Sequence, residues 1–236
     1  MSRRRRTPCR GGIYHVVQRG NRRQAIYETD QDRHLFLEMM ADTLPRFGFR
    51  YHGYCLMGNH YHLLVETPNA NLSKGMHWLN GVYAARFNAR HDVDGHLFQD
   101  RYWASPVTGA QAITEVARYI AANQLRAGLC DRAELWPWST YPMALGITRR
   151  PSHVKLDLIM ALFDAHLGVH EARARFRQLV EQEPPARPLL ATVLPDLDAA
   201  RGAGYSLREI GAAAGLDPST VMRRLRTVSG YRPCSP

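Results

Sequence analysis

Residues 58–66 of the chain read Gly-Asn-His-Tyr-His-Leu-Leu-Val-Glu, and this stretch predicts the central strand of the fold. Apolar and β-branched residues follow two histidines that are two positions apart, a pattern typical of a strand. Because successive side chains of a strand point to opposite faces, His60 and His62 leave the same face, and Tyr61 leaves the other. Two imidazoles in this arrangement can share one divalent ion. Taken alone, a histidine pair of this spacing is structural about as often as it is functional.

A second stretch, Arg-Tyr-Ile-Ala-Ala-Asn at residues 118–123, is the predicted partner of the histidine strand. The apolar residues Ile113, Val116, Ala117 and Ile120 have the spacing of a helix. In such a helix, Tyr119 and Asn123 are four residues apart and lie on one face. If this helix packs beside the strand, the Asn123 side chain can supply an oxygen as the third metal ligand. The Tyr119 hydroxyl would then lie close to whatever the metal polarises. Such a site would cleave phosphodiesters.

The sequence resembles a known family, the single-tyrosine HUH endonucleases, and specifically the REP-associated tyrosine transposases. Four segments carry the resemblance, in the order of the family and between about Gly11 and Gly146: Gly58-Asn59-His60-Tyr61-His62, Leu97-Phe98-Gln99-Asp100-Arg101-Tyr102, Tyr119-Ile120-Ala121-Ala122-Asn123-Gln124-Leu125-Arg126-Ala127-Gly128-Leu129 and Trp138-Ser139-Thr140-Tyr141. The resemblance implies that Tyr119 attacks a phosphodiester of single-stranded DNA. The tyrosine becomes joined to the 5′-phosphate and a free 3′-hydroxyl is released. It also implies a target with a hairpin formed by a repetitive extragenic palindrome.

The chemistry of the predicted site favours magnesium or manganese. A tyrosine hydroxyl, with an unperturbed pKa near ~10, is a poor nucleophile at neutral pH and needs assistance. Two imidazole nitrogens from His60 and His62 and an amide oxygen from Asn123 would suit Mg²⁺ or Mn²⁺ better than zinc. The family commonly continues from the asparagine with proline, whereas this chain has Gln124. Gln124 is therefore an alternative to Asn123 as the third ligand.

The order of the predicted elements indicates an α+β fold. Strands are expected at 13–19, 49–57, 60–66 and 97–107, and helices at 30–47, 72–90 and around Tyr119. Asp30 is the predicted N-cap of the first helix, Gly48 its end, and Gly58-Asn59 a hairpin turn. The order β-α-β-β-α-β-α is typical of a ferredoxin-like antiparallel sheet, with its helices expected on one face. The resemblance implies the same fold.

The composition favours a polyanionic partner. The formal net charge of the 236 residues is +10, and arginine, which suits bidentate phosphate contacts, carries most of the positive charge. The four cysteines form no C-x-x-C pair, so neither a zinc knuckle nor a disulfide framework is expected and a reducing cytosol fits. Neither a signal peptide nor an apolar run long enough to cross a bilayer is present. We therefore expect a cytoplasmic, nucleoid-associated protein with no membrane partner, either a monomer or a homodimer.

Arginines and aromatic residues supply candidate DNA contacts. The predicted DNA-binding residues are Arg3, Arg4, Arg5, Arg6, Arg19, Arg22, Arg23, Arg101, Arg126, Arg223 and Arg224. Tyr102, Trp103, Trp136 and Trp138 offer surfaces on which bases of a single strand could stack. The segment with the last two tryptophans could equally be a lid packed over the core. His15 is expected to pack near the sheet without a functional role, and His52 is a polar side chain without one.

Three regions are expected along the chain. A basic arm at 1–12 precedes a catalytic domain at 13–148, and an alanine-rich helical region follows at 149–236. Within the last region, residues 206–227 combine a capping-box pattern, a turn and a second helix opened by Asp217-Pro218, which indicates a small all-helical domain. That pattern is typical of a helix-turn-helix with a basic recognition helix, and duplex DNA is a candidate partner for it.

Two rival functions remain open from the sequence. One is a DNA-binding regulator in which the C-terminal region reads duplex DNA and the histidine site is vestigial. The other is a plasmid replication-initiator nickase, which shares the chemistry but differs in its substrate.

Overall fold

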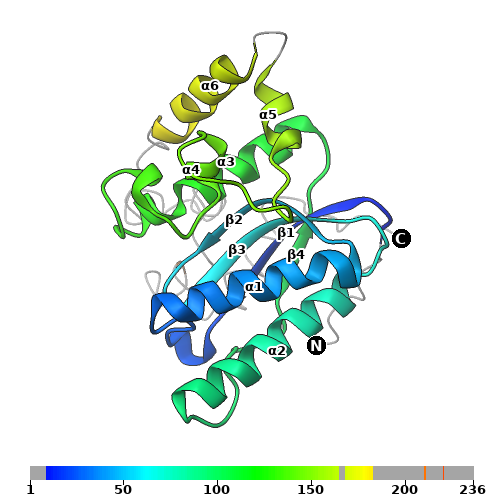
Figure 1. Ribbon diagram of the computed structural model, residues 1–236, viewed down its shortest axis with the longest axis vertical. Coiled ribbons are helices and arrows are strands. Elements are labelled where there is room, and N and C mark those ends of the chain that lie inside the picture. Colours follow the sequence, from blue (N-terminus) through cyan, green and yellow to red (C-terminus); the bar gives the residue numbers. More distant parts are fainter. Residues whose placement is uncertain (1–8, 165–167, 183–209, 211–219, 221–236) are drawn as a thin grey trace. The chain divides into compact units, whose positions relative to one another are not determined.

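The structure, a computed structural model, describes residues 9–164 and 168–182 and the single positions 210 and 220. Contacts within the chain divide it into a first unit, Met1–Glu181, and a second unit, Gln182–Pro236. The elements described below all belong to the first unit (Figure 1). The predicted basic arm up to residue 8 and nearly all of the predicted helix-turn-helix at 206–227 lie outside the described residues.

The core of the first unit is a four-stranded antiparallel sheet. Its strands are β1 (Gly12–Arg19), β2 (Arg50–Leu56), β3 (His60–Thr67) and β4 (Trp103–Pro106). They lie in the order β2-β3-β1-β4, so β3, which carries His60 and His62, lies between β2 and β1. β2 and β3 form the expected hairpin, closed by a hydrogen bond in which the Met57 amide donates to the His60 carbonyl. Element order and sheet order confirm the predicted ferredoxin-like α+β fold.

β4 is shorter than the strand predicted at 97–107. Residues 97–99 still follow β1, because the Gln99 amide donates to the Arg19 carbonyl and Phe98 bridges to Gly20. Between them and β4 the chain bulges, and the buried Gln18 side chain donates from Nε2 to the Asp100 carbonyl at 2.7 Å. The side-chain hydrogen bond replaces the backbone ladder there, so regular pairing begins only at Trp103.

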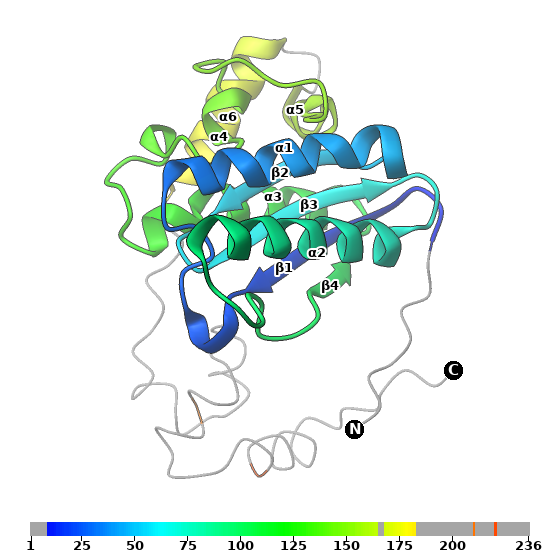
Figure 2. The same cartoon turned by 60° about the horizontal axis from the view of Figure 1, so that its bottom comes forward.

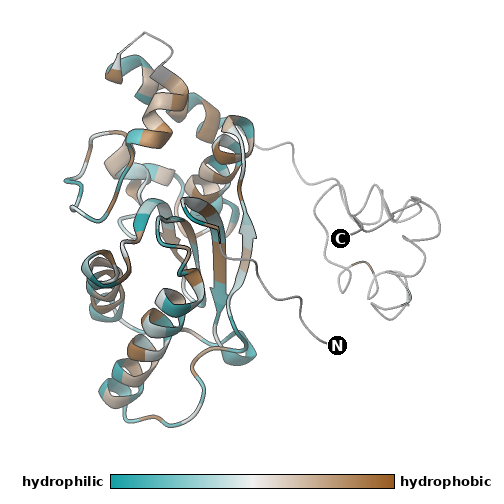
Figure 3. Cartoon of the chain, turned by 90° about the vertical axis from the view of Figure 1, so that its right-hand side faces the viewer, coloured by the Kyte–Doolittle hydropathy of each residue, from teal (hydrophilic) through white to brown (hydrophobic). Residues whose placement is uncertain are grey.

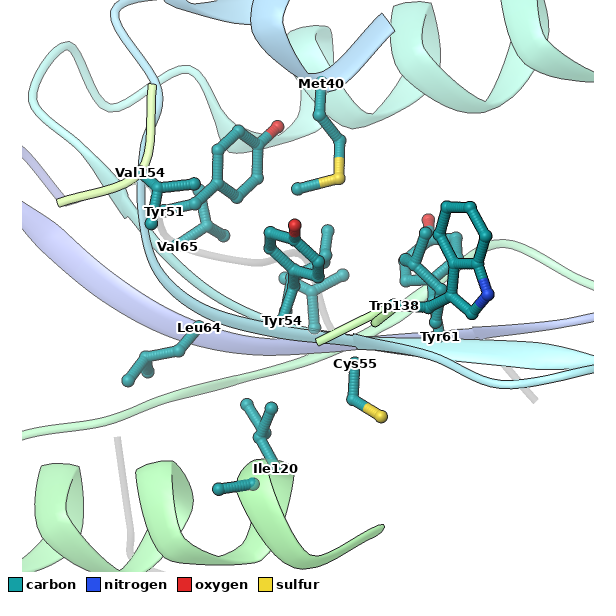
Figure 4. Close-up of a cluster of buried hydrophobic side chains, with 14 of the residues drawn as sticks. Met40, Tyr51, Tyr54, Cys55, Tyr61, Leu64, Val65, Ile120, Trp138 and Val154 are labelled. Atoms are coloured by element: carbon teal, nitrogen blue, oxygen red, sulfur yellow. The ribbon is translucent and has the colours of Figure 1, made fainter. Parts of the chain in front are cut away.

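Helices cover both faces of the sheet, not one face as expected. The helices α1 (Asp30–Phe47) and α2 (Leu72–His91) lie side by side on one face, and α3 (Ala110–Arg126) lies on the other (Figure 2). The buried core reflects this layering (Figure 4): Tyr61 packs toward α1 and meets Phe36, whereas Cys55 points toward α3. Both strands of the hairpin are therefore covered on both sides, and β2 is buried at every position after Arg50.

The first helix begins with a capping box one residue earlier than expected. Thr29 is the N-cap, and the fully buried Asp32 carboxylate accepts hydrogen bonds from the Thr29 amide at 2.8 Å and from the Glu28 amide at 3.0 Å. Asp30, the predicted N-cap, is the first helical residue instead. A carboxylate at the third helical position satisfies amides that no helical carbonyl can reach. Gly48 ends the helix with φ of 74°, as predicted.

Two later segments cover the outer edge of β2. Residues 138–140 pair with it through Leu56 and Tyr54, and residues 153–155 pair with it through Tyr51. Trp136 donates from Nε1 to the Leu56 carbonyl at 3.1 Å, and the Arg33 guanidinium lies 5.5 Å from the ring centre of the buried Trp138. Of the two interpretations left open by the sequence, the lid over the core is therefore the correct one. A covered edge also cannot pair with another chain.

The helices after residue 148 pack on α3 and belong to the same compact unit. They are α5 (Asp157–Asp164) and α6 (Val169–Glu181), preceded by the short elements η2 (Ala133–Leu135) and α4 (Tyr141–Ala144). Apolar and polar residues alternate along the helices (Figure 3), and Ile159, Phe176 and Val180 are buried. The boundary expected after residue 148 thus lies after residue 181, because these apolar faces complete the core beneath α3. Within the described residues, no helix has the length and apolar character of a membrane span.

Candidate active site

His60 and His62 project from β3 toward the α3 face of the sheet, as the strand period requires. Their ring centres are 5.1 Å apart and the ring planes are nearly perpendicular, at 79°. His62 is only 4% exposed, whereas His60 is partly exposed. The alternate residue Tyr61 is buried on the opposite face (Figure 4). The two imidazoles therefore form a pair that solvent reaches from one side.

Tyr119 of α3 meets this pair on the α3 face of the sheet. Its ring centre lies 5.3 Å from that of His62, with an edge-to-face angle of 81°. Tyr119 is partly exposed, while Ile113, Ala117 and Ile120 of the same helix are buried against the sheet. The spacing of these apolar residues fixes the rotation of α3 and so leaves Tyr119 at the margin of the core. The strand and the helix identified from the sequence thus converge, although 57 positions separate His62 and Tyr119 in the chain.

His15 of β1 is a third imidazole in the same cluster. Its Nε2 lies 3.1 Å from Nδ1 of His62, and the two ring planes are nearly parallel, at 24°, with centres 5.3 Å apart. The His15 ring also meets the edge of Tyr119 at 5.7 Å. The sequence alone predicts only a packing role for His15. Its position follows from the antiparallel register, in which His15 lies opposite Leu64 and so shares a face with His62.

Asn59, in the turn before β3, fixes the ring of His60. Its Oδ1 lies 2.7 Å from Nδ1 of His60, and its Nδ2 donates to the Arg23 carbonyl at 2.9 Å. The second bond assigns the amide orientation, so Oδ1 is the acceptor and Nδ1 of His60 is the donor. Nε2 of His60 is then left without a proton and available to a ligand. Asn59 belongs to the motif quoted above, but no role was predicted for it.

Asn123 and Gln124, the two candidates for a third ligand, differ in their surroundings. Asn123 donates from Nδ2 to the carbonyl of Tyr119 at 3.0 Å, which leaves its Oδ1 as the polar atom that could bind a ligand. Gln124 is fully buried, donates to the carbonyls of Ala121 and Ala133, and accepts a hydrogen bond from Cys55. Gln124 is therefore committed to the packing of α3 on the sheet, and the alternative ligand is excluded.

Burial and nearby positive charge keep the three imidazoles neutral. Burial lowers the pKa of His15 to about 4, and burial together with the Arg19 charge lowers the pKa of His60 to about 4. For His62, burial, the neighbouring His15 and His60, and Arg19 all lower the pKa well below its ordinary value. Neutral imidazoles are the form that binds metal ions. Among the described residues, no three His, Cys, Asp or Glu side chains form a cage around an ion, and the candidate set here includes an amide instead.

Several predicted DNA-contacting arginines lie near this site. Arg19 is exposed and directly opposite His60 in the sheet. Arg126 lies over the Tyr119 ring, 5.1 Å from its centre, where burial and then Arg118 lower the pKa of its guanidinium. Arg22 and Arg23 are exposed in the short helix η1 (Asn21–Arg23). Arg101 is exposed, and Arg3, Arg4, Arg5, Arg6, Arg223 and Arg224 lie outside the described residues.

The aromatic candidates separate clearly by exposure. Tyr102 and Trp138 are 6% and 8% exposed, so neither presents a ring face to a base, whereas Trp103 is 51% exposed. Trp103 lies opposite Val17 in the sheet and meets the edge of His15 at 5.6 Å. Among the four aromatic residues considered, Trp103 is the one with a large exposed surface beside the histidine cluster.

A groove lies on the other face of the sheet, away from the histidine pair. It runs between α2 and residues 95–102 and is lined in part by Gln18, His77 and Asn80. Of the predicted DNA-contacting residues, Arg101 and Tyr102 line it, whereas His60, His62, Tyr119 and Asn123 do not.

Comparison with known proteins identifies the class of the first unit. Residues 10–123 match the family model described as transposase, IS200 like. This match contains His15, His60, His62 and Tyr119 and ends at Asn123. It confirms, over residues 10–123, the resemblance inferred from the sequence motifs.

A solved structure supports the fold of this domain. The structure of a REP-associated tyrosine transposase bound to a REP hairpin aligns with a TM-score of 0.54 and 16% identity, covering 66% of this chain and 98% of the other. A putative transposase from Deinococcus radiodurans R1 aligns with 18% identity and a TM-score of 0.36, covering 50% of this chain and 95% of the other. The comparison with curated protein sequences gave no match.

Proposed function

We propose that this transposase is a metal-dependent, single-stranded DNA endonuclease and strand transferase of the REP-associated type. The observation that carries the proposal is the convergence of His62 and Tyr119, with ring centres 5.3 Å apart, beside a second histidine that shares the same face. A phenol adjacent to a histidine pair supplies both a nucleophile and ligands for a cation. The family match and the fold support the same reaction class.

His60, His62 and Asn123 would hold the ion, which we propose to be Mg²⁺ or Mn²⁺. An ion about 2.1 Å from an imidazole nitrogen lies roughly 3.2 Å from the ring centre, so two rings that share it have centres at most about 6.4 Å apart. The separation of 5.1 Å is within that limit. Two nitrogens and one amide oxygen leave coordination positions for phosphate and water, and the donor set suits these metals. When bound, the ion polarises the scissile phosphate and stabilises the charge on its oxygens.

Tyr119 would act as the nucleophile of the strand cleavage. Its hydroxyl oxygen attacks the phosphorus, the bond from phosphorus to the 3′-oxygen breaks, and the released 3′-oxygen takes up the proton that the phenol loses. The DNA 5′-phosphate is then joined to the tyrosine. Attack by the 3′-hydroxyl of another strand reverses the step and joins the two strands, because the phosphotyrosine bond retains the energy of the original bond.

The open part of the sheet beside the cluster would accept the DNA strand. Val17 and Ser105 are only partly buried on the face that carries His62, and Arg19 and Trp103 are exposed there. Arginine can neutralise phosphates, and an exposed indole can stack on a base. The solved relative is bound to a REP hairpin, and we propose a hairpin of this kind as the partner of the present chain.

The proposal is tested by covalent trapping. The full chain is incubated with a single-stranded, hairpin-flanked oligonucleotide and Mg²⁺, and the products are separated on a denaturing gel. We expect a covalent protein–DNA adduct and a free 3′-hydroxyl fragment. Tyr119→Phe should abolish the adduct but retain DNA binding, and Tyr14→Phe is the matched control because Tyr14 is a buried tyrosine on the opposite face of β1.

An adduct of normal yield from Tyr119→Phe would remove Tyr119 from the role of nucleophile. Binding of duplex DNA by the full chain without cleavage of any single strand would support a DNA-binding regulator instead. Nicking at a sequence without an adjacent hairpin would favour a replication-initiator nickase.

A further inference from the structure

His15 contacts both groups on which the proposed reaction depends. Its Nε2 lies 3.1 Å from Nδ1 of His62, and its ring meets the edge of Tyr119 at 5.7 Å. Trp103 lies against the ring at 5.6 Å. Because His15 and His62 are on neighbouring strands joined by a continuous backbone ladder, their relative positions are fixed by the sheet.

The contact between the two rings determines where His62 carries its proton. A hydrogen bond between two ring nitrogens requires one donor and one acceptor. If Nδ1 of His62 donates, its Nε2 has a free lone pair; if Nδ1 accepts, a neutral His62 carries its proton on Nε2 and cannot bind an ion through that nitrogen. The direction of this bond therefore decides whether His62 can act as a ligand.

His60 shows the same arrangement with a different partner. Its Nδ1 lies 2.7 Å from Oδ1 of Asn59, so both histidines of the motif have Nδ1 engaged by a neighbouring side chain. In each case Nε2 is the nitrogen left for a ligand. In metal sites, the group that orients a metal-binding imidazole typically forms a hydrogen bond with the ring nitrogen that does not bind the metal.

We propose that His15 is a positioning residue that accepts a hydrogen bond from Nδ1 of His62. It holds the His62 ring in the orientation and tautomer that leave Nε2 free for the catalytic ion. The inference rests on the proposed function, because it gives His62 the role of a metal ligand. His15 itself is not a ligand in this arrangement, since the nitrogen that faces His62 is occupied by the hydrogen bond.

The tautomer of His62 is the first test, and it needs no metal. Long-range ¹H–¹⁵N NMR of the metal-free full chain distinguishes a proton on Nδ1 from one on Nε2. We expect the proton of His62 on Nδ1 in the wild type. In His15→Phe the acceptor is removed while the aromatic contacts are kept, and the proton should move to Nε2. In His15→Gln the amide oxygen can occupy the place of Nε2, and the proton should return to Nδ1.

Mn²⁺ binding is the second test and is measured by electron paramagnetic resonance of the free ion, without DNA. His15→Phe should weaken Mn²⁺ binding by about 10–100-fold, the usual cost of removing a partner that orients a ligand. His15→Gln should recover most of the affinity. His153→Phe is the control, because His153 is a buried histidine that contacts Tyr51 rather than the cluster, and it should bind like the wild type.

The outcomes separate this inference from the proposed function. If His60→Ala and His62→Ala lose Mn²⁺ binding but His15→Phe does not, the role of His15 is wrong and the metal site stands. If His60→Ala and His62→Ala bind Mn²⁺ like the wild type, the proposed metal site itself is wrong. A His62 proton on Nε2 in the wild type would overturn the inference by itself, as would a His15→Gln variant as defective as His15→Phe.

Discussion

At the scale of single residues, the site depends on side chains that bind no substrate themselves. Asn59 connects the turn before β3 to the His60 ring, and its amide is anchored by the carbonyl of Arg23. The chain thus holds His60 through two hydrogen bonds in series. A ligand whose ring is held in place loses less conformational freedom when an ion binds.

Replacement of Asn59 by alanine should weaken the site without unfolding the protein. We expect Asn59→Ala to reduce Mn²⁺ affinity and the rate of strand cleavage by about 10–100-fold, because the His60 ring loses its acceptor. The measurements are metal titration and the rate of adduct formation. Asn88→Ala is a matched control, since Asn88 makes a similar bond to the Gly95 carbonyl away from the site. Equal losses in both variants would show that Asn59 acts only on stability.

The sequence predicts the reactive residues better than the residues that orient them. The strand period places His60 and His62 on one face, and the helix period places Tyr119 and Asn123 on one face, so each pair follows from local geometry alone. The role of His15 depends on the register between β1 and β3, which is a long-range property. A partial signal was nevertheless present, because His15 alternates with Val17 and Arg19 on a predicted strand and so leaves the same face of that strand as they do.

At the scale of elements, α1 and α2 are held together at one end by a buried charge. The Asp32 carboxylate in the first turn of α1 accepts from Thr29 and lies 2.9 Å from Nε2 of His91 at the end of α2. Burial raises the pKa of Asp32, but hydrogen bonds from His91 and Thr29 outweigh it, and the pKa is lowered overall. The ionised carboxylate therefore stabilises the pair of helices that covers one face of the sheet.

Asp32→Asn should lower the free energy of unfolding at pH 7 by about 1–3 kcal/mol, the usual cost of losing hydrogen bonds to a buried charge. A lowered folded-state pKa gives stability that is complete above the unfolded value of about 3.9 and is lost as the pH falls through the folded value. The difference between wild type and variant should thus shrink below about pH 4 in urea titrations. Asp30→Asn, on an exposed carboxylate, is the control; a difference independent of pH would contradict the assignment.

Most elements were predictable from the sequence, but their layering was not. The positions of α1, α2 and the hairpin follow from periodicity, from Gly48 and from the Gly58-Asn59 turn. The side of the sheet on which α3 lies depends on the burial of Cys55 and Leu64 on one face and Tyr61 on the other. The residues on both faces of the hairpin are apolar enough to be buried. The alternating pattern therefore did not predict that helices cover both faces of the sheet.

At the scale of the whole molecule, the compact unit that carries the site extends to residue 181. Val154 and Leu156 are buried beside β2, and Ile159, Phe176 and Val180 are buried in the layer beneath α3. The change to an alanine-rich composition after residue 150 suggested a boundary there. Composition alone does not distinguish a separate helical domain from helices that complete the core of the preceding one.

Truncation distinguishes these two possibilities. A chain ending at Glu181 should unfold cooperatively with a Tm close to that of the full chain. A chain ending at Thr148 should lose more than about 10 °C, because several apolar side chains worth roughly 1.5–3 kcal/mol each no longer cover α3 and the edge of β2. The measurement is circular dichroism on heating. Equal Tm values for the two shortened chains would indicate that the domain boundary lies at residue 148, as predicted from the sequence.

The central claim is that Tyr119 forms the covalent link to DNA, and peptide mapping of the adduct tests it most directly. Trypsin cleaves after Arg118 and Arg126, and the peptide 119–126 contains a single tyrosine. After reaction with a hairpin-flanked oligonucleotide and Mg²⁺, followed by nuclease trimming, mass spectrometry should find the added nucleotide phosphate on this peptide. The same mass on a peptide that carries another tyrosine, or on none, would contradict the account.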